Sequence, residues 1–131
     1  MAEMTSYPPG TFCWVDLATP DPEASKAFYG DVFGWTARDL PTDLGPPYTM
    51  LSFDGRQTCG LYRLPPGRGE NAYWSSHVSV SDVDAAAKRA VDLGATLVRP
   101  PTDVMEEGRI CYIQDPTGAL VGLWQARANA G

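Results

Sequence analysis

The sequence has little of what several classes of protein depend on. Its 131 residues carry 10 basic against 16 acidic side chains, which gives a net charge of −6. Nucleic acids and anionic membrane surfaces attract basic proteins, so neither is an expected partner. No apolar run reaches the length of a bilayer span, so the sequence predicts no transmembrane helix.

Cysteine is also scarce, and so are targeting signals. The three thiols, Cys13, Cys59 and Cys111, are an odd set without CxxC spacing. We interpret them as reduced, structural thiols. The opening stretch MAEMTSYPPG has no basic region followed by an apolar one, so no signal peptide is predicted. These features together predict a cytoplasmic protein.

What the chain does have is an internal repeat. Matching segments lie 60 to 62 positions apart and keep their order: Pro41-Thr42-Asp43 with Pro101-Thr102-Asp103, Asp21 with Asp82, Asp54-Gly55 with the turn DPTG at 115–118, and Gly60 with Gly122. This collinearity predicts one domain, residues 1–131, made of two similar halves at about 8–65 and 70–127. The two Pro-Thr-Asp copies are expected in equivalent loops.

Both halves are predicted to follow the order strand, helix, strand, strand, strand. The expected strands are 11–18, 35–39, 48–53 and 57–63, then 74–81, 96–99, 109–114 and 119–125; Asp21 and Ser81 or Asp82 cap the helices, and Gly34 and Gly94 end them. One helix cannot cover both faces of four strands, so the bare faces must meet each other or a ligand. The predicted fold class is α+β, with two tandem βαβββ modules forming a curved mixed sheet around a cleft.

Three segments resemble the vicinal oxygen chelate superfamily, which contains glyoxalase I, extradiol dioxygenases and bleomycin-resistance proteins. They are WVDLATPDPEASKAFYGDVFGW (14–35) and HVSVSDVDAAAKRAVDLGA (77–95) for the two opening segments, and DPTGALVGLWQ (115–125) for the closing strand. The resemblance implies the glyoxalase/bleomycin resistance/dioxygenase fold and a homodimer. It does not imply one activity, because the scaffold hosts many chemistries.

The enzymes of this superfamily usually hold a divalent cation with His, Glu or Gln from the opening and closing strands. Carried over to this sequence, the four ligand positions are Trp14, Gly60, Ser75 and Gly122. None supplies the imidazole nitrogen or carboxylate oxygen that such an ion needs. We therefore expect no metal site and no cofactor.

The expected cleft contains aromatic rings with space beside them. Such walls suit a flat, largely apolar small molecule, although each ring could equally fill the core. Strand alternation places the following residues on the cleft face and predicts that they contact the ligand: Phe12, Trp14, Asp16, Met50, Thr58, Gly60, Tyr62, Ser75, His77, Leu120, Gly122 and Trp124.

Asp16 and the single histidine, His77, are the ionisable residues expected on this face. They occupy equivalent positions of the repeat, so we expect them to approach each other. Three roles stay open: a mutual charge-assisted hydrogen bond, a hydrogen bond to a ligand carbonyl or phenol, and proton transfer.

The sequence favours a metal-free protein of the bleomycin-resistance type, which would confer antibiotic resistance by sequestering an aromatic natural product or antibiotic. The alternative is a metal-independent enzyme of the same superfamily, an isomerase, lyase or hydroxylase-like catalyst using His77 and Asp16 for proton transfer. A third possibility is an interaction module whose cleft is filled by core side chains.

Overall fold

The computed structural model describes residues 6–42, 46–65, 67, 69 and 71–128. They form two compact units, each containing one helix and strands of one sheet. The α1 unit is Val15–Ser75, and the α2 unit joins the residues up to Trp14 to those from Ser76 onward. No helix within these described ranges is long and apolar enough to cross a membrane.

The unit boundary differs from the repeat boundary because the N-terminal stretch pairs with the second module. The Gly10 amide donates to the Ser79 carbonyl at 2.8 Å, and the Ser79 amide donates to the Thr11 carbonyl at 2.8 Å. These bonds attach the stretch before Val15 to the α2 unit, although it precedes the first module in sequence.

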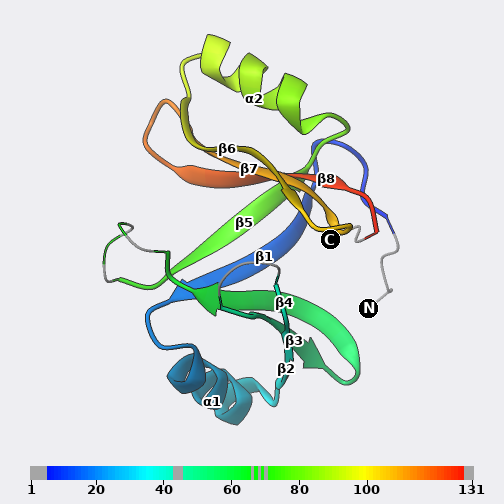
Figure 1. Ribbon diagram of the computed structural model, residues 1–131, viewed down its shortest axis with the longest axis vertical. Helices are drawn as coiled ribbons and strands as arrows, with labels where there is room; N and C mark the ends of the chain where they lie inside the picture. The colour runs from blue at the N-terminus through cyan, green and yellow to red at the C-terminus, as the bar shows by residue number, and fades with distance from the viewer. Residues whose placement is uncertain (1–5, 43–45, 66, 68, 70, 129–131) are drawn as a thin grey trace. The chain divides into compact units, whose positions relative to one another are not determined.

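The first module has the expected order of elements. In its sheet the strands run β2-β3-β4-β1, with β1 parallel to β4 and the other neighbours antiparallel. The elements are β1 (Phe12–Thr19), α1 (Pro22–Phe33), β2 (Thr36–Leu40), β3 (Tyr48–Phe53) and β4 (Arg56–Arg63) (Figure 1).

The second module repeats this arrangement. Its strands run β5-β8-β7-β6, again with one parallel pair, β5 and β8. The elements are β5 (Tyr73–Ser79), α2 (Val83–Asp92), β6 (Thr96–Val104), β7 (Gly108–Gln114) and β8 (Leu120–Ala126). The predicted α+β class with two βαβββ modules and mixed sheets is confirmed.

The helices begin where the sequence predicted. Asp21 Oδ1 accepts the Ala24 amide at 3.1 Å, and Asp82 Oδ1 accepts the Ala85 amide at 3.1 Å. Each bond satisfies an amide that the first helical turn leaves unpaired. Gly34 ends α1 with φ of 75°, in the left-handed region that favours glycine.

The expected pair of Pro-Thr-Asp loops is wrong for the second copy. Pro101-Thr102-Asp103 lies inside β6, whereas Pro41 and Thr42 follow β2 and Asp43 lies outside the described residues. β6 is the last strand of its unit's sheet, so a missing proline amide does not break a ladder on its outer side. Its pairing with β7 shifts register on both sides of Arg99.

Each sheet buries one face under its own helix. In the α2 unit α2 lies along β6, β7 and β8 (Figure 1). The core on this side contains Cys111, Ile113 and Leu123, with Val78 and Val80 packed against it. In the α1 unit the corresponding core is Leu17, Leu51, Cys59 and Leu61. Strand alternation therefore turns Asp16 and His77 to the faces opposite the helices, as the sequence predicted.

Candidate functional site

The face opposite each helix carries one buried ionisable side chain beside a glycine. In the α1 unit, Asp16 of β1 pairs in register with Gly60 of β4. In the α2 unit, His77 of β5 pairs with Gly122 of β8. Asp16 is 4% exposed and His77 is 1% exposed. The two modules thus share the pairing of a buried ionisable residue with a glycine, but the residue is an aspartate in the first module and a histidine in the second.

Asp16 lies under a tyrosine of β3. The Tyr48 hydroxyl donates to Asp16 Oδ2 at 3.3 Å, and the Tyr48 ring stacks with Tyr62 at 6.1 Å between centroids. A Cβ atom on Gly60 would collide with the Tyr48 hydroxyl, so the glycine makes room for this contact. Burial raises the pKa of Asp16 to about 7, although the Tyr48 hydrogen bond acts in the other direction. Near neutral pH both protonation states are populated.

His77 has a protein partner at each ring nitrogen. Nδ1 lies 3.3 Å from the Trp14 carbonyl oxygen, and Nε2 lies 2.8 Å from the Tyr112 hydroxyl. A carbonyl oxygen only accepts, so we assign the proton to Nδ1 and let Nε2 accept from Tyr112. Burial lowers the pKa of His77 to about 4, against the opposing effect of the Trp14 carbonyl. The imidazole is therefore neutral at pH 7.

The other residues of the α1 unit that were expected to contact the ligand differ in how deeply they are buried. Met50 of β3 pairs with Gly60 of β4 and is buried. Tyr62, which also lies on β4, is half-buried. Thr58 is exposed near the β3–β4 hairpin. Ser75 is 3% exposed, and its Oγ has no hydrogen-bond partner within the described part of the chain. Ser75 thus offers a buried hydroxyl for a polar group of a ligand.

In the α2 unit the expected contacts are mainly half-buried. Trp14, Leu120 and Trp124 are all in this class. The Trp124 ring lies over Gly108, where a Cβ atom would be 2.5 Å from it. Phe12, by contrast, is 64% exposed at the start of β1. The contact of Asp16 with His77, and the cleft expected between the modules, stay predictions.

Tyr48 and Tyr112 are the residues that the sequence analysis missed. Tyr48 lies two residues before Met50, on the same face of β3, and Tyr112 pairs directly with Gly122. Strand parity could have found Tyr48, because it stands two positions from Met50, whereas Tyr112 is identified only by the register of β7 with β8. Each hydroxyl bonds to the ionisable group of its own unit, so each tyrosine belongs to the candidate site of that unit.

The residues do not fit the divalent cation that the superfamily's enzymes hold. At two of the four inferred ligand positions, Gly60 and Gly122, the space for a side chain is taken by Tyr48 and by the His77 ring. Nowhere in the described ranges do three or more His, Cys, Asp or Glu side chains come together as ligands.

The cysteines do not form a nucleophilic site. All three are buried free thiols. Burial raises the pKa of Cys13 and Cys111 to about 11 and that of Cys59 to about 12. A reactive cysteine needs a lowered pKa, so these thiols fill space in the core.

Comparison with known proteins agrees with this fold. The model of the glyoxalase/bleomycin resistance protein/dioxygenase superfamily matches residues 11–123. "Putative glyoxylase CFP32" of Mycobacterium tuberculosis is 39% identical over 134 residues, which cover 100% of this chain and 51% of the relative. "Anthracycline biosynthesis protein DnrV" of Streptomyces peucetius is 33% identical over 141 residues, covering 98% of this chain and 51% of the relative. The chain spans about half the length of these curated relatives.

Solved structures show the same fold at lower identity. Methylmalonyl-CoA epimerase from Mycobacterium tuberculosis is 23% identical with a TM-score of 0.62, over 94% of this chain and 91% of the epimerase. The Mn(II)-bound glyoxalase from Novosphingobium aromaticivorans is 18% identical with a TM-score of 0.60, over 93% of this chain and 41% of that chain. Likeness at this level concerns the fold alone.

Proposed function

Because the chain belongs to the glyoxalase/bleomycin resistance protein/dioxygenase superfamily, we propose that it binds planar aromatic natural products without a metal and protects its host by sequestering them. One observation carries the proposal: the side chains of Tyr48 and His77 occupy the space beside Gly60 and Gly122, the positions where the resemblance places two metal ligands of the superfamily's enzymes. The proposed place of action is the cytoplasm, where free thiols stay reduced.

Half-buried rings supply the apolar part of the proposed binding. Tyr48 and Tyr62 form a stacked pair on the α1 unit, and Trp14 and Trp124 are half-buried on the α2 unit. Burying one aromatic ring contributes on the order of 2–3 kcal/mol, and association costs offset part of it. Two or three such contacts support a dissociation constant on the order of micromolar.

Buried hydroxyls supply the polar part. Tyr48, Tyr112 and Ser75 offer donors or acceptors for phenol and quinone oxygens. A relative that is named for anthracycline biosynthesis supports this ligand class, since anthracyclines are planar, oxygen-rich aromatic molecules. The protein would then select flat rings that bear oxygen over plain hydrocarbons.

We expect an anthracycline and a dihydroxyanthraquinone to quench the tryptophan fluorescence of the protein saturably, with a dissociation constant on the order of micromolar. At ligand concentrations well above that constant the melting temperature should rise by several degrees. Both compounds should be recovered chemically unchanged, as mass spectrometry will show. Unsubstituted anthraquinone, which lacks the phenols, should bind more weakly.

A pair of tryptophan variants controls this titration. Trp124→Phe should reduce the quenching, because Trp124 lies on the proposed ligand face, whereas Trp35→Phe should not, because Trp35 packs against the core beside α1. Absence of saturable binding by either compound, or recovery of an altered compound, would refute sequestration.

A metal-independent enzyme is the second candidate, favoured by the environment of Asp16. A buried carboxyl whose pKa is about 7 suits proton transfer at neutral pH. His77 is less suited as a base, because both its nitrogens already have partners, and it would instead position the Tyr112 hydroxyl. The Asp16 carboxylate would take a proton from a carbon conjugated with a ligand carbonyl, leaving an enolate, and later return it.

This candidate predicts deuterium uptake by anthrone, a tricyclic ketone with acidic C–H bonds, when it is incubated with the protein in D2O. Uptake above the buffer rate should vanish in Asp16→Asn and persist in part in His77→Gln, as mass spectrometry of the anthrone will show. An exchange rate equal to that of buffer alone would exclude this activity for anthrone and leave binding as the function.

A further inference from the structure

The α1 unit has a pocket on the helix side of its sheet. Its volume is about 360 Å³, which lies within the range of small-molecule sites. Three aromatic side chains, Phe28, Tyr29 and Trp74, line it together with Leu17, Ser25 and two alanines, and none of these described residues is charged. Leu17 belongs to the core under α1, so the pocket is separate from the candidate ligand face on the opposite side of the sheet.

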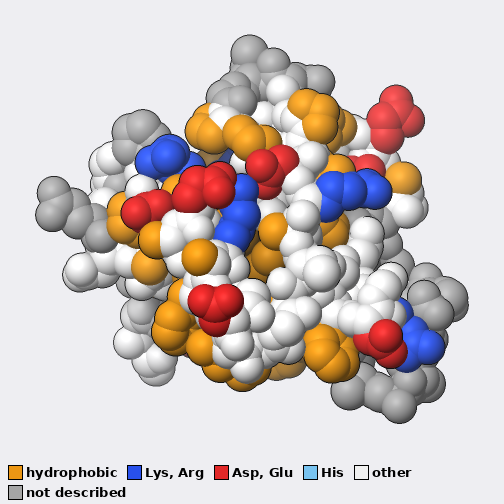
Figure 2. Space-filling view, turned by 90° about the horizontal axis from the view of Figure 1, so that it is seen from below, with side chains coloured by type: hydrophobic (Ala, Val, Ile, Leu, Met, Phe, Trp, Pro, Cys, Tyr) orange, Lys and Arg blue, Asp and Glu red, His pale blue; other side chains and the backbone are white. Residues whose placement is uncertain are grey.

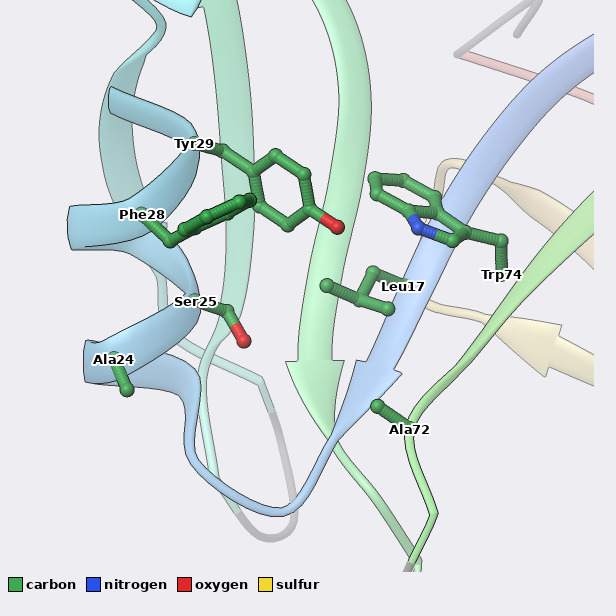
Figure 3. Close-up of a pocket in the computed structure, with 7 residues that line it drawn as sticks. All are labelled: Leu17, Ala24, Ser25, Phe28, Tyr29, Ala72 and Trp74. Atoms are coloured by element: carbon green, nitrogen blue, oxygen red, sulfur yellow. The ribbon is translucent and has the colours of Figure 1, made fainter. Parts of the chain in front are cut away.

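The three rings enclose this pocket from different directions. The Phe28 and Trp74 rings lie 5.0 and 5.4 Å from the Tyr29 ring between centroids, and they stand at 85° and 77° to it. Figure 3 shows Tyr29 between Phe28 on one side of the pocket and Trp74 on the other. Phe28 is 59% exposed and Trp74 is 41% exposed, so part of each ring is open to a ligand. Proteins use several aromatic rings around one space to bind quaternary ammonium groups.

The charges around the pocket favour a positively charged ligand. Lys26 Nζ lies 2.7 Å from a Glu23 oxygen and 3.0 Å from an Asp39 oxygen, so two carboxylates flank one ammonium group. Figure 2, seen from the side on which Figure 1 draws α1, shows acidic side chains beside hydrophobic ones. Together with the net charge of −6, this surface attracts cations and repels anions. On and beside α1 the acidic residues outnumber the basic ones, with Asp21, Glu23, Asp31 and Asp39 against Lys26 and Arg63.

The hydroxyl in the pocket lining presents lone pairs to a ligand. Ser25 Oγ donates its proton to Thr19 Oγ1 at 2.9 Å, and the same Thr19 oxygen accepts the Asp21 amide at 3.2 Å. A hydroxyl whose proton is already engaged offers only its lone pairs. Ser25 can therefore accept from an ammonium N–H or contact the polarised methyl groups of a quaternary ammonium, whereas it would repel an anion.

We propose that this pocket binds small organic cations that carry a tertiary or quaternary ammonium group and an apolar arm. The ammonium group lies against the rings of Phe28, Tyr29 and Trp74, and the apolar arm packs against Leu17. The negative faces of the rings supply the short-range attraction, and the carboxylates around Lys26 add a longer-range one. This ligand class differs from the flat, oxygen-bearing rings proposed for the candidate ligand face, so the two proposals stand separately.

Choline and the uncharged alcohol in which carbon replaces its nitrogen test the need for charge, because the two molecules have the same shape. We expect choline to shift the NMR signals of the α1 backbone amides and of the Trp74 indole N–H in the isotope-labelled full chain. The shifts should saturate with a dissociation constant on the order of millimolar. The uncharged alcohol should bind at least about 10-fold more weakly.

Replacing a ring by leucine separates attraction to the aromatic face from simple burial. In Phe28→Leu and in Trp74→Leu the pocket keeps an apolar wall, so choline binding should weaken about 3- to 10-fold while binding of the uncharged alcohol changes little. Phe33→Leu is the matched control, because Phe33 is 50% exposed on the same helix and stacks on Tyr29 but lies outside the described lining. It should bind choline as the wild type does.

Three results would overturn the proposal. They are the absence of saturable choline binding, equal affinity for choline and the uncharged alcohol, and undiminished choline binding in both Phe28→Leu and Trp74→Leu. Circular dichroism spectra that match the wild type show that the variants are folded. The titrations use no aromatic natural product, so their outcome is independent of the proposed sequestration.

Discussion

Gly122→Ala is expected to lower the free energy of unfolding by about 3 kcal/mol or more, as overpacking of a closed site does. An added Cβ would stand 2.8 Å from Nε2 and 2.9 Å from Cγ of His77, closer than such atoms approach in proteins. The ring cannot withdraw, because it is 1% exposed and is hydrogen-bonded at both nitrogens. Moving it would leave a buried polar group without a partner, which adds to the cost.

Gly60→Ala is the matched control in the other module. Its Cβ would meet the hydroxyl end of Tyr48, which is half-buried and can swing away. We expect a loss of about 1 kcal/mol, corresponding to the hydrogen bond with Asp16. Urea unfolding of the two variants measures the difference. Equal losses of unfolding free energy would show that the His77 ring is no harder to displace from Gly122 than the Tyr48 ring is from Gly60.

The second large effect is on the pH dependence of stability, to which Asp16 and His77 contribute with opposite signs. The folded pKa of Asp16, about 7, lies above its ordinary value of 3.8, so the folded state binds this proton more tightly. The associated stability is fully present below pH 3.8 and is lost as the pH rises to about 7. The loss is on the order of 4 kcal/mol.

His77 acts with the opposite sign. Its folded pKa, about 4, lies below its ordinary value of 6.5, so the unfolded state binds the proton more tightly. Its contribution is fully present above pH 6.5 and is lost as the pH falls to about 4. The loss is on the order of 3 kcal/mol.

Single variants should separate the two effects between about pH 4 and pH 7. In Asp16→Asn the His77 effect remains, so stability should rise with pH more steeply than in the wild type. In His77→Gln the Asp16 effect remains, so stability should fall with pH relative to the wild type. Urea unfolding across this range measures both, and the surface carboxylates shared by all three proteins cancel in the comparison. Parallel curves would disprove the described burial of both groups.

Local sequence signals account for the doubled module and for the sheet faces on which the candidate site residues lie. Helix caps such as Asp21 and Asp82 act on amides three residues away, and strand alternation acts on next neighbours. Because these signals are local, strand alternation places Asp16 opposite the α1 core and His77 opposite the α2 core without reference to tertiary contacts.

Tertiary contacts, in contrast, establish which side chains meet on those faces and which stay exposed. Tyr112 reaches His77 through the register of β7 and β8, and Tyr48 reaches Asp16 from a strand 32 positions along the chain. The helical spacing of Phe28 and Val32 predicts a buried face of α1, yet both side chains are exposed. Register and burial depend on contacts between distant residues, and local sequence patterns do not encode them.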